Sequence, residues 1–234
     1  NYFEDEDSFF NYHSSGGSSS NRNTLDFNLN IGDLVYTAAV DTTNTDCYIF
    51  TPSGENLLIV EEIEQVLAVY DNGSIIFTEF EDMSDYVIFH LKRMDPDETV
   101  SHIATLNNWG GDWDLDSWGN IVYITNNDLF LVSPYGHVQQ IAWGAFEGAD
   151  AVAVHPKTGD YYVADSRGKR IVRVKSHGQV DYLYDVPEHL EWMEGFDFTP
   201  EGILIIADEA SEALYSFDGV SLTMIAQGGL IEAP

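Results

Sequence analysis

The sequence is poor in basic residues. It has nine lysines and arginines against 40 aspartates and glutamates, which gives a formal net charge of −31 at pH 7. Such a chain is repelled by the phosphates of nucleic acids and by anionic membrane surfaces, so we expect neither as a partner. Because salt screens the repulsion between acidic side chains, the charge favours a secreted protein in a salt-rich medium. We therefore predict an extracellular, cell-surface or periplasmic location.

Cysteine, long apolar runs and helical periodicity are also scarce. The one cysteine, Cys47, excludes an intrachain disulfide, and we expect its thiol to be buried in a strand. No apolar run approaches the roughly 18 residues of a membrane-spanning helix, so we predict no transmembrane segment. Apolar residues at helical spacing are nearly absent, whereas short alternating segments recur, and this pattern indicates an all-β protein.

The sequence does contain enough apolar side chains for a core. Hydrophobic residues make up 44% of the chain and aromatic residues 13%, which excludes a wholly disordered protein. The N-terminus differs, because an acidic-aromatic cluster leads there into a tract rich in Ser, Gly and Asn. That composition is typical of a flexible segment. We therefore predict a flexible segment over residues 1–23 and one folded domain over residues 24–234.

The folded domain contains an internal repeat. In each unit a turn glycine separates two short apolar strands, and the units recur every 40 to 46 residues, a period of about the length of a propeller blade. Each unit continues with a third and a fourth strand, such as RIVRV and VDYLYDV. The turn glycines are Gly32, Gly73, Gly119, Gly159 and Gly202.

Four short antiparallel strands per unit are typical of a β-propeller blade. A four-stranded sheet with two apolar faces must stack on neighbouring sheets, which a propeller allows. We therefore predict an all-β fold, a β-propeller of four-stranded antiparallel blades with five repeats visible, in a ring of five or six blades. A β-sandwich and a β-solenoid are the alternatives.

Two segments resemble blades of a known superfamily. ADAVAVHPKTGDYYVADSRGKRIVRVKSHGQV and EGFDFTPEGILIIADEASEALYSFDG are similar to blades of the NHL-repeat and gluconolactonase/regucalcin-like (SMP-30) β-propellers. The resemblance is fair over residues 65–228 and weak over residues 24–64. This superfamily contains lactonases, lyase-like enzymes and pure binding modules, so the resemblance implies a fold more than a function.

The resemblance also implies a metal position. In the lactonase branch, carboxylate and amide side chains at the starts of the innermost strands hold a divalent cation on the channel axis. The residues at those positions here are Thr24, Gln65, Gly111, Asp150 and Glu194. The expected metal residues are therefore Asp150 and Glu194, with Asp112 beside them. Ligand oxygens from separate blades suit Ca²⁺ or Mg²⁺.

Further candidates follow from the strand pattern. Asp114 and Asp197 each lie five residues before a turn glycine and form a predicted second acidic layer. Trp109, Trp143 and Trp192 lie near strand starts and blade links, where an indole could stack on a sugar ring.

One cluster of basic residues interrupts the acidic sequence. Six of the nine basic residues fall in the fourth unit, and they form a candidate patch for self-association by charge complementarity. They are Lys157, Arg167, Lys169, Arg170, Arg173 and Lys175. The ends of the second strands carry Glu79, Asn126, Asp165 and Asp208, which predict an acidic face that suits a cationic ligand. Charge that serves only solubility is the alternative interpretation of that face.

No catalytic motif stands out. The sequence has no nucleophile elbow, no zinc-binding HExxH motif and no glycine-rich phosphate loop. Our first hypothesis is therefore a non-catalytic binding or assembly module for a protein or carbohydrate partner, with Ca²⁺ at the channel mouth. The alternatives are a metal-dependent lactonase and a carbohydrate-binding propeller, so the question of enzymatic activity stays open.

Overall fold

The computed structural model is built from β-strands. Twenty strands and no helix occur in the part of the chain that the structure describes. This part comprises residues 9–10, 34–39, 45–50, 53–54, 56–63, 65–69, 73–82, 87–107, 112–125 and 127–228. The chain divides into two compact units, Asn1–Asn108 and Trp109–Pro234.

The first unit contains two four-stranded antiparallel sheets. One sheet has the order β1 (Phe9–Phe10), β2 (Leu34–Ala39), β3 (Thr45–Phe50) and β4 (Asn56–Ile63). The other has the order β5 (Gln65–Val69), β6 (Ile75–Asp82), β7 (Val87–Met94) and β8 (Val100–Asn107). Cys47 is fully buried in β3, as predicted.

The second unit contains three such sheets. The first has β9 (Trp113–Leu115), β10 (Ile121–Ile124), β11 (Leu129–Val132) and β12 (Val138–Ala142). The second has β13 (Ala149–Val154), β14 (Tyr161–Asp165), β15 (Arg170–Val174) and β16 (Val180–Asp185). The third has β17 (Met193–Phe198), β18 (Leu204–Asp208), β19 (Ala213–Phe217) and β20 (Leu222–Gln227).

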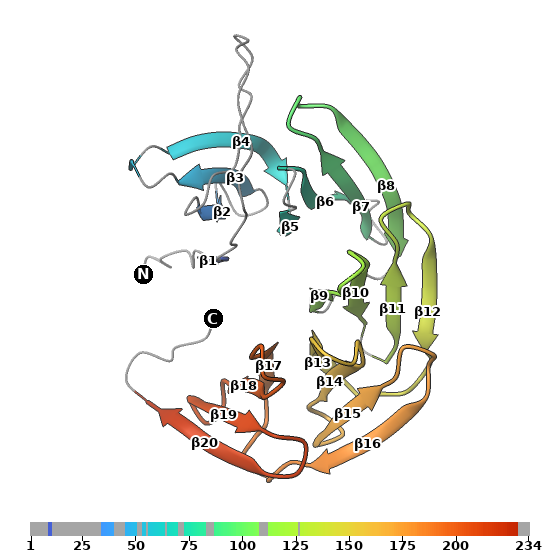
Figure 1. The fold of residues 1–234 in the computed structure, drawn as a ribbon, viewed down its shortest axis with the longest axis vertical. Coiled ribbons are helices and arrows are strands. Elements are labelled where there is room, and N and C mark those ends of the chain that lie inside the picture. The colour runs from blue at the N-terminus through green and yellow to red at the C-terminus, as the bar shows by residue number, and fades with distance from the viewer. Residues whose placement is uncertain are drawn as a thin grey trace. The chain divides into compact units, whose positions relative to one another are not determined.

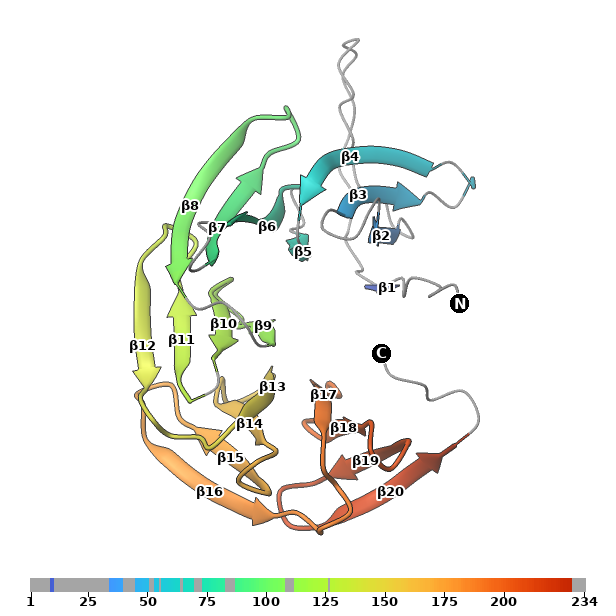
Figure 2. The same cartoon turned by 180° about the vertical axis from the view of Figure 1, so that it is seen from behind.

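Each sheet is a meander of four consecutive strands, and this is the blade of a β-propeller. Within the second unit, β9, β13 and β17 lie on the inner side of their blades, and β12, β16 and β20 lie on the outer side (Figures 1 and 2). The predicted all-β fold of four-stranded antiparallel blades is therefore confirmed, with five blades among the described residues.

The repeated glycine has a conformational cause. The four turn glycines within the described residues have φ angles between 68° and 92°, which L-residues rarely adopt. In the third blade the turn is also held by a carboxylate, since Asp116 accepts hydrogen bonds at 2.9 Å from the backbone N–H groups of Trp118 and Asn120. Glycine therefore recurs because the hairpin between the first two strands needs a left-handed residue.

The blades are apolar on both faces because each face packs on a neighbouring blade. In the second unit, Val152 and Val154 of β13 join a core cluster with Val122 of β10, whereas Ala151 belongs to a cluster with Phe196 of β17. Alternate residues of one strand point to opposite faces of a sheet. The two clusters therefore fix the order of the three blades within this unit.

The N-terminal segment contributes one short strand. Phe9 and Phe10 pair with Tyr36 and Val35 of β2, so β1 is the first strand of its sheet. The repeat, whose first unit reads TLDFNLNIGDLVYTAAV, predicts the segment before Gly32 in that position, and this segment lies outside the described residues. The domain boundary between residues 23 and 24 lies there too and stays a prediction.

Candidate functional site

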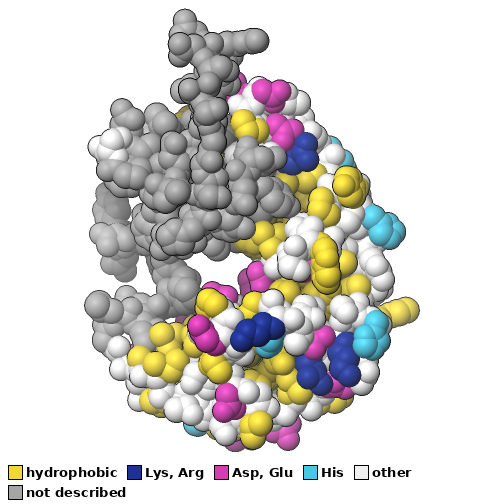
Figure 3. All heavy atoms as spheres, viewed as in Figure 1, with side chains coloured by type: hydrophobic (Ala, Val, Ile, Leu, Met, Phe, Trp, Pro, Cys, Tyr) yellow, Lys and Arg dark blue, Asp and Glu magenta, His cyan; other side chains and the backbone are white. Residues whose placement is uncertain are grey.

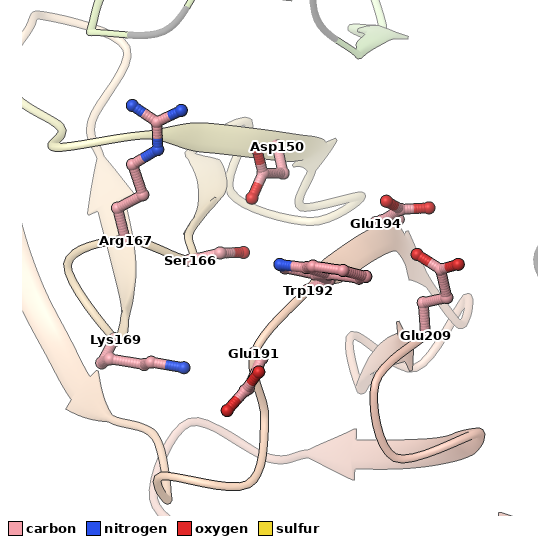
Figure 4. A pocket seen from close by; sticks show the side chains of 8 residues that line it. All are labelled: Asp150, Ser166, Arg167, Lys169, Glu191, Trp192, Glu194 and Glu209. Atoms are coloured by element: carbon pink, nitrogen blue, oxygen red, sulfur yellow. The ribbon is translucent and has the colours of Figure 1, made fainter.

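The second unit carries a pocket where two of its blades meet. Its volume is about 550 Å³, within the range of small-molecule sites. Residues of the β13–β16 blade line one side and residues of the β17–β20 blade line the other. The lining residues are Asp150, Ser166, Arg167, Lys169, Glu191, Trp192, Glu194 and Glu209 (Figure 4).

The segment that leads into β17 is anchored by its backbone. Val186 and Leu190 are buried in the core between the blades. The N–H of Trp192 donates to Oδ1 of Asp208 at 3.0 Å, and the N–H of Glu209 donates to the carbonyl oxygen of Trp192 at 3.0 Å. The indole of Trp192 is nevertheless 55% exposed. A fixed backbone thus presents an open aromatic ring to the pocket.

Three carboxylates from two blades line the pocket. Asp150 lies near the start of β13, Glu194 near the start of β17, and Glu209 directly after β18. Partial burial, the charge of Glu209 and a hydrogen bond with Glu209 raise the pKa of Glu194, and the charges of Asp150 and Asp208 raise it further. We call these three carboxylates the acidic side. A bound cation would stabilise their charged forms.

Two cations line the same pocket. The side chain of Arg167 is exposed and makes no hydrogen bond or ion pair with any described residue. Nζ of Lys169 donates to the carbonyl oxygen of Leu190 at 3.0 Å, which leaves two of its three N–H groups for other acceptors. Both residues lie in the turn between β14 and β15, so one blade supplies the positive charge.

Asp112 occupies a different place from the other two predicted metal residues. Its Oδ2 accepts a hydrogen bond from the N–H of Val152 in β13 at 3.0 Å, and Asp112 is not among the pocket-lining residues. Burial raises the pKa of Asp112 to about 7, although its hydrogen bonds oppose this shift. The structure thus brings Asp150 and Glu194 together and directs Asp112 to the backbone of the next blade.

The predicted second acidic layer also contacts the backbone. Asp114 accepts hydrogen bonds from the N–H of Leu115 and the N–H of Val154, both at 2.6 Å. Burial is the main cause that raises the pKa of Asp114 to about 6, and the charge of Asp197 adds to it. Asp197 is exposed and accepts a hydrogen bond from the N–H of Phe198 at 2.6 Å. Asp112 and Asp114 therefore join β9 to β13.

The carboxylate oxygens around the pocket do not surround a common point. Among the residues that the structure describes, no three His, Cys, Asp or Glu side chains are placed to hold a metal ion. The carboxylates of the acidic side are at least partly exposed, so their rotamers are free to change. The predicted metal role of Asp112, Asp150 and Glu194 stays a prediction.

The three candidate tryptophans have different positions. Trp192 lines the pocket, whereas Trp143 is 85% exposed and is not among the lining residues. Trp109 lies outside the described residues. Among the candidate tryptophans that the structure describes, Trp192 is therefore the one that lines the same pocket as other predicted site residues.

The basic residues of the fourth blade mostly have partners within the chain. Nε of Arg170 lies 2.8 Å from Oδ2 of Asp165, and Arg173 contacts Asp181 at 2.6 Å. Acidic side chains lie beside the basic ones on the face seen in Figure 3. Lys157 donates to the carbonyl oxygen of Glu201, and Lys175 lies 3.6 Å from Asp181. Self-association through this patch stays a prediction that rests mainly on Arg167.

Sequence reasoning missed three lining residues. Ser166 follows the buried Asp165 at the end of β14, and Glu209 follows the buried Asp208 at the end of β18. The two residues therefore hold the same place in two blades, and an alignment of the second strands would have found both. Glu191 lies in the link between blades, where the repeat gives no signal.

None of the described residues form a helix that is long and apolar enough to cross a membrane. No family model and no curated protein matches this sequence.

Solved structures do match. Virginiamycin B lyase from Staphylococcus aureus has 12% sequence identity and a TM-score of 0.62, over 83% of this chain and 66% of that one. A calcium-binding protein, regucalcin, from Agrobacterium tumefaciens has 15% identity and a TM-score of 0.60, over 84% and 70%. A Bacteroides thetaiotaomicron protein of unknown function has 10% identity and a TM-score of 0.59, over 83% and 55%.

These likenesses concern the fold. The predicted resemblance to regucalcin-like β-propellers is confirmed at that level. The chain spans 66% and 55% of the length of the first two structures that it resembles. One propeller fold supports a lyase in one protein and calcium binding in another, so the function has to be argued from the pocket.

Proposed function

We propose that the protein is a non-catalytic binding module and that the pocket between the β13–β16 and β17–β20 blades is its ligand site. The observation that carries this proposal is that Asp150, Glu194 and Glu209, from two blades, line one small pocket. The raised pKa of Glu194 supports it, because such a cluster is stabilised by a positively charged ligand. The simplest ligand of this kind is Ca²⁺.

The chemistry of the acidic side suits Ca²⁺ better than zinc or copper. It offers carboxylate oxygens and neither sulfur nor imidazole. Ca²⁺ tolerates irregular geometry, whereas Mg²⁺ requires near-octahedral coordination. Because the carboxylates must first be drawn together, we expect a weak site. Dissociation constants of about 10⁻⁴–10⁻³ M are typical of extracellular calcium modules, which agrees with the proposed extracellular, cell-surface or periplasmic location.

Calorimetric titration with CaCl₂ tests this proposal. We expect the wild-type protein to bind Ca²⁺. The Glu194→Gln variant should bind it at least about tenfold more weakly, because the amide has no negative charge and only one ligand oxygen. Glu201→Gln removes the same charge from an exposed residue outside the pocket and should bind as the wild type does. An equal loss in both variants would show that only the overall charge attracts the ion.

The lactonase alternative is tested in the same samples. We expect no lactone hydrolysis with Ca²⁺, Mg²⁺, Mn²⁺ or Zn²⁺ present. Hydrolysis that depends on a metal and disappears in the Glu194→Gln variant would contradict the binding-module proposal and show that the protein is a lactonase.

A second candidate function is carbohydrate binding. The observation in its favour is the exposed indole of Trp192 within the pocket, since an aromatic face can stack on a sugar ring. Binding to a glycan array that is lost in Trp192→Ala and kept in Trp143→Ala would support this candidate. Binding that both variants retain would exclude the pocket as the sugar site.

A further inference from the structure

The charged side chains of the pocket differ between the two sides of the Trp192 indole. Figure 4 shows Glu194 and Glu209 on one side of the Trp192 indole and Arg167 and Lys169 on the other. Asp150 and Glu191 also line the pocket, on the same side of the ring as the two basic residues. Glu194 and Glu209 belong to the β17–β20 blade, whereas Arg167 and Lys169 belong to the β13–β16 blade. A ligand that reaches from Glu194 and Glu209 to Arg167 therefore meets carboxylates at one end and a guanidinium at the other.

The basic side can bind an anion. Arg167 has no partner among the described residues, so its guanidinium has no intramolecular ion pair to give up. A guanidinium matches a carboxylate with two parallel hydrogen bonds. Lys169 adds a second donor, and its stem is held in place by the bond to the carbonyl oxygen of Leu190.

The acidic side and the indole can bind an organic cation. A cation over a tryptophan face gains cation–π attraction, and the effect is largest for weakly hydrated ammonium groups. The backbone of Trp192 is fixed by its bonds to Asp208 and Glu209, so the segment that carries the ring need not be ordered on binding. Glu194 and Glu209 supply the balancing negative charge beside the ring.

We propose that the organic ligand of this pocket is a zwitterion, an ammonium carboxylate whose ammonium lies against Trp192, Glu194 and Glu209 and whose carboxylate lies against Arg167 and Lys169. This inference rests on the proposed function, because it takes the pocket to be the binding site. A pocket of about 550 Å³ accepts a molecule of this size with a spacer of several carbons. Ca²⁺ and the ammonium group then compete for the same carboxylates.

Calorimetry with trimethylammonium carboxylates of increasing spacer length tests the proposal. The probes are glycine betaine, 4-trimethylammonium butyrate and 6-trimethylammonium hexanoate. Choline carries only the cation and acetate only the anion. We expect one of the longer zwitterions to bind at least about tenfold more tightly than choline or acetate, and we expect CaCl₂ to weaken it.

Two variants test the two ends of the ligand separately. In Arg167→Gln the zwitterion should lose its advantage over choline, while choline should bind at least as tightly as before, because a positive charge has been removed from the same pocket. In Trp192→Ala both cations should bind at least about tenfold more weakly, while Trp143→Ala serves as the matched control. A zwitterion that binds no better than choline, or that binds Arg167→Gln unchanged, would overturn the inference.

The outcomes separate this inference from the proposed function. If Ca²⁺ binds through Glu194 and no zwitterion binds, the zwitterion inference is wrong and the cation site stands. If neither Ca²⁺ nor any probe binds in the pocket, both are wrong.

Discussion

Replacing Asp165 by alanine is expected to lower the free energy of unfolding by about 3–5 kcal/mol, as for other broken buried ion pairs. Asp165 is fully buried and accepts hydrogen bonds from the N–H groups of Glu147 and Gly148, each at 2.9 Å. Its other oxygen lies 2.8 Å from Nε of Arg170. The variant leaves these donors without an acceptor, and Arg170 keeps only a distant contact with Glu147 and its position over the ring of Tyr182.

Equilibrium unfolding in urea measures this loss, and a second ion pair in the same blade provides the control. Asp181 contacts Arg173 at 2.6 Å, but both side chains remain a quarter or more exposed to solvent. Asp181→Ala should therefore cost much less than Asp165→Ala, because solvent screens an exposed ion pair. A loss in Asp165→Ala that is no larger than the loss in Asp181→Ala would contradict the structural role that we assign to Asp165.

Stability is expected to fall as the pH rises from about 4 to about 7, through the ionisation of Asp112 and Asp114. The folded pKa values are raised, mainly by burial, from 3.8 to about 7 for Asp112 and about 6 for Asp114. Within this window the folded state binds more protons than the unfolded state does, so proton loss favours unfolding. At about 1.4 kcal/mol per pKa unit the two shifts together correspond to about 7 kcal/mol. We expect a combined loss of about 2–4 kcal/mol, because solvent reaches both side chains and weakens the effect.

Unfolding midpoints measured in steps from pH 4 to pH 8 check this expectation. The double variant Asp112→Asn, Asp114→Asn keeps an oxygen acceptor at each position but cannot ionise, so its midpoint should vary less with pH than that of the wild type. Asp197→Asn changes the exposed member of the layer and should reduce the slope only slightly, because the charge of Asp197 is a lesser cause of the raised pKa of Asp114 than burial is. A double variant with the wild-type slope would show that other acidic residues cause the pH dependence.

The repeat could be predicted from the sequence because its signals are local. A glycine with positive φ at Gly73, Gly119, Gly159 and Gly202 marks each inner hairpin, and alternating apolar residues mark the strands beside it. The meeting of Asp150 and Glu194 also follows from the repeat, because equivalent positions of neighbouring blades lie side by side. The predicted all-β propeller and this part of the site therefore needed no knowledge of tertiary contacts.

Other roles depend on contacts that residue types do not reveal. The carboxylate of Asp112 could be a metal ligand, but it accepts a hydrogen bond from the N–H of Val152. Any residue other than proline at position 152 would supply this N–H group. Asp165 resembles a surface acid and is buried under the turn that precedes β13. The roles of such carboxylates can be assigned only when the positions of the neighbouring backbone N–H groups are known. The same is true of the basic patch, in which Arg170 and Arg173 are paired within their own blade.

The central claim is that the pocket beside Trp192 is the ligand site of this propeller. A crystal structure grown with CaCl₂, and a second grown with the tightest-binding trimethylammonium carboxylate, test it most directly. We predict electron density for the ion beside Glu194 and Glu209, and density for the organic ligand across the Trp192 ring toward Arg167. Ligand density at another place, with the pocket empty in both crystals, would contradict the claim.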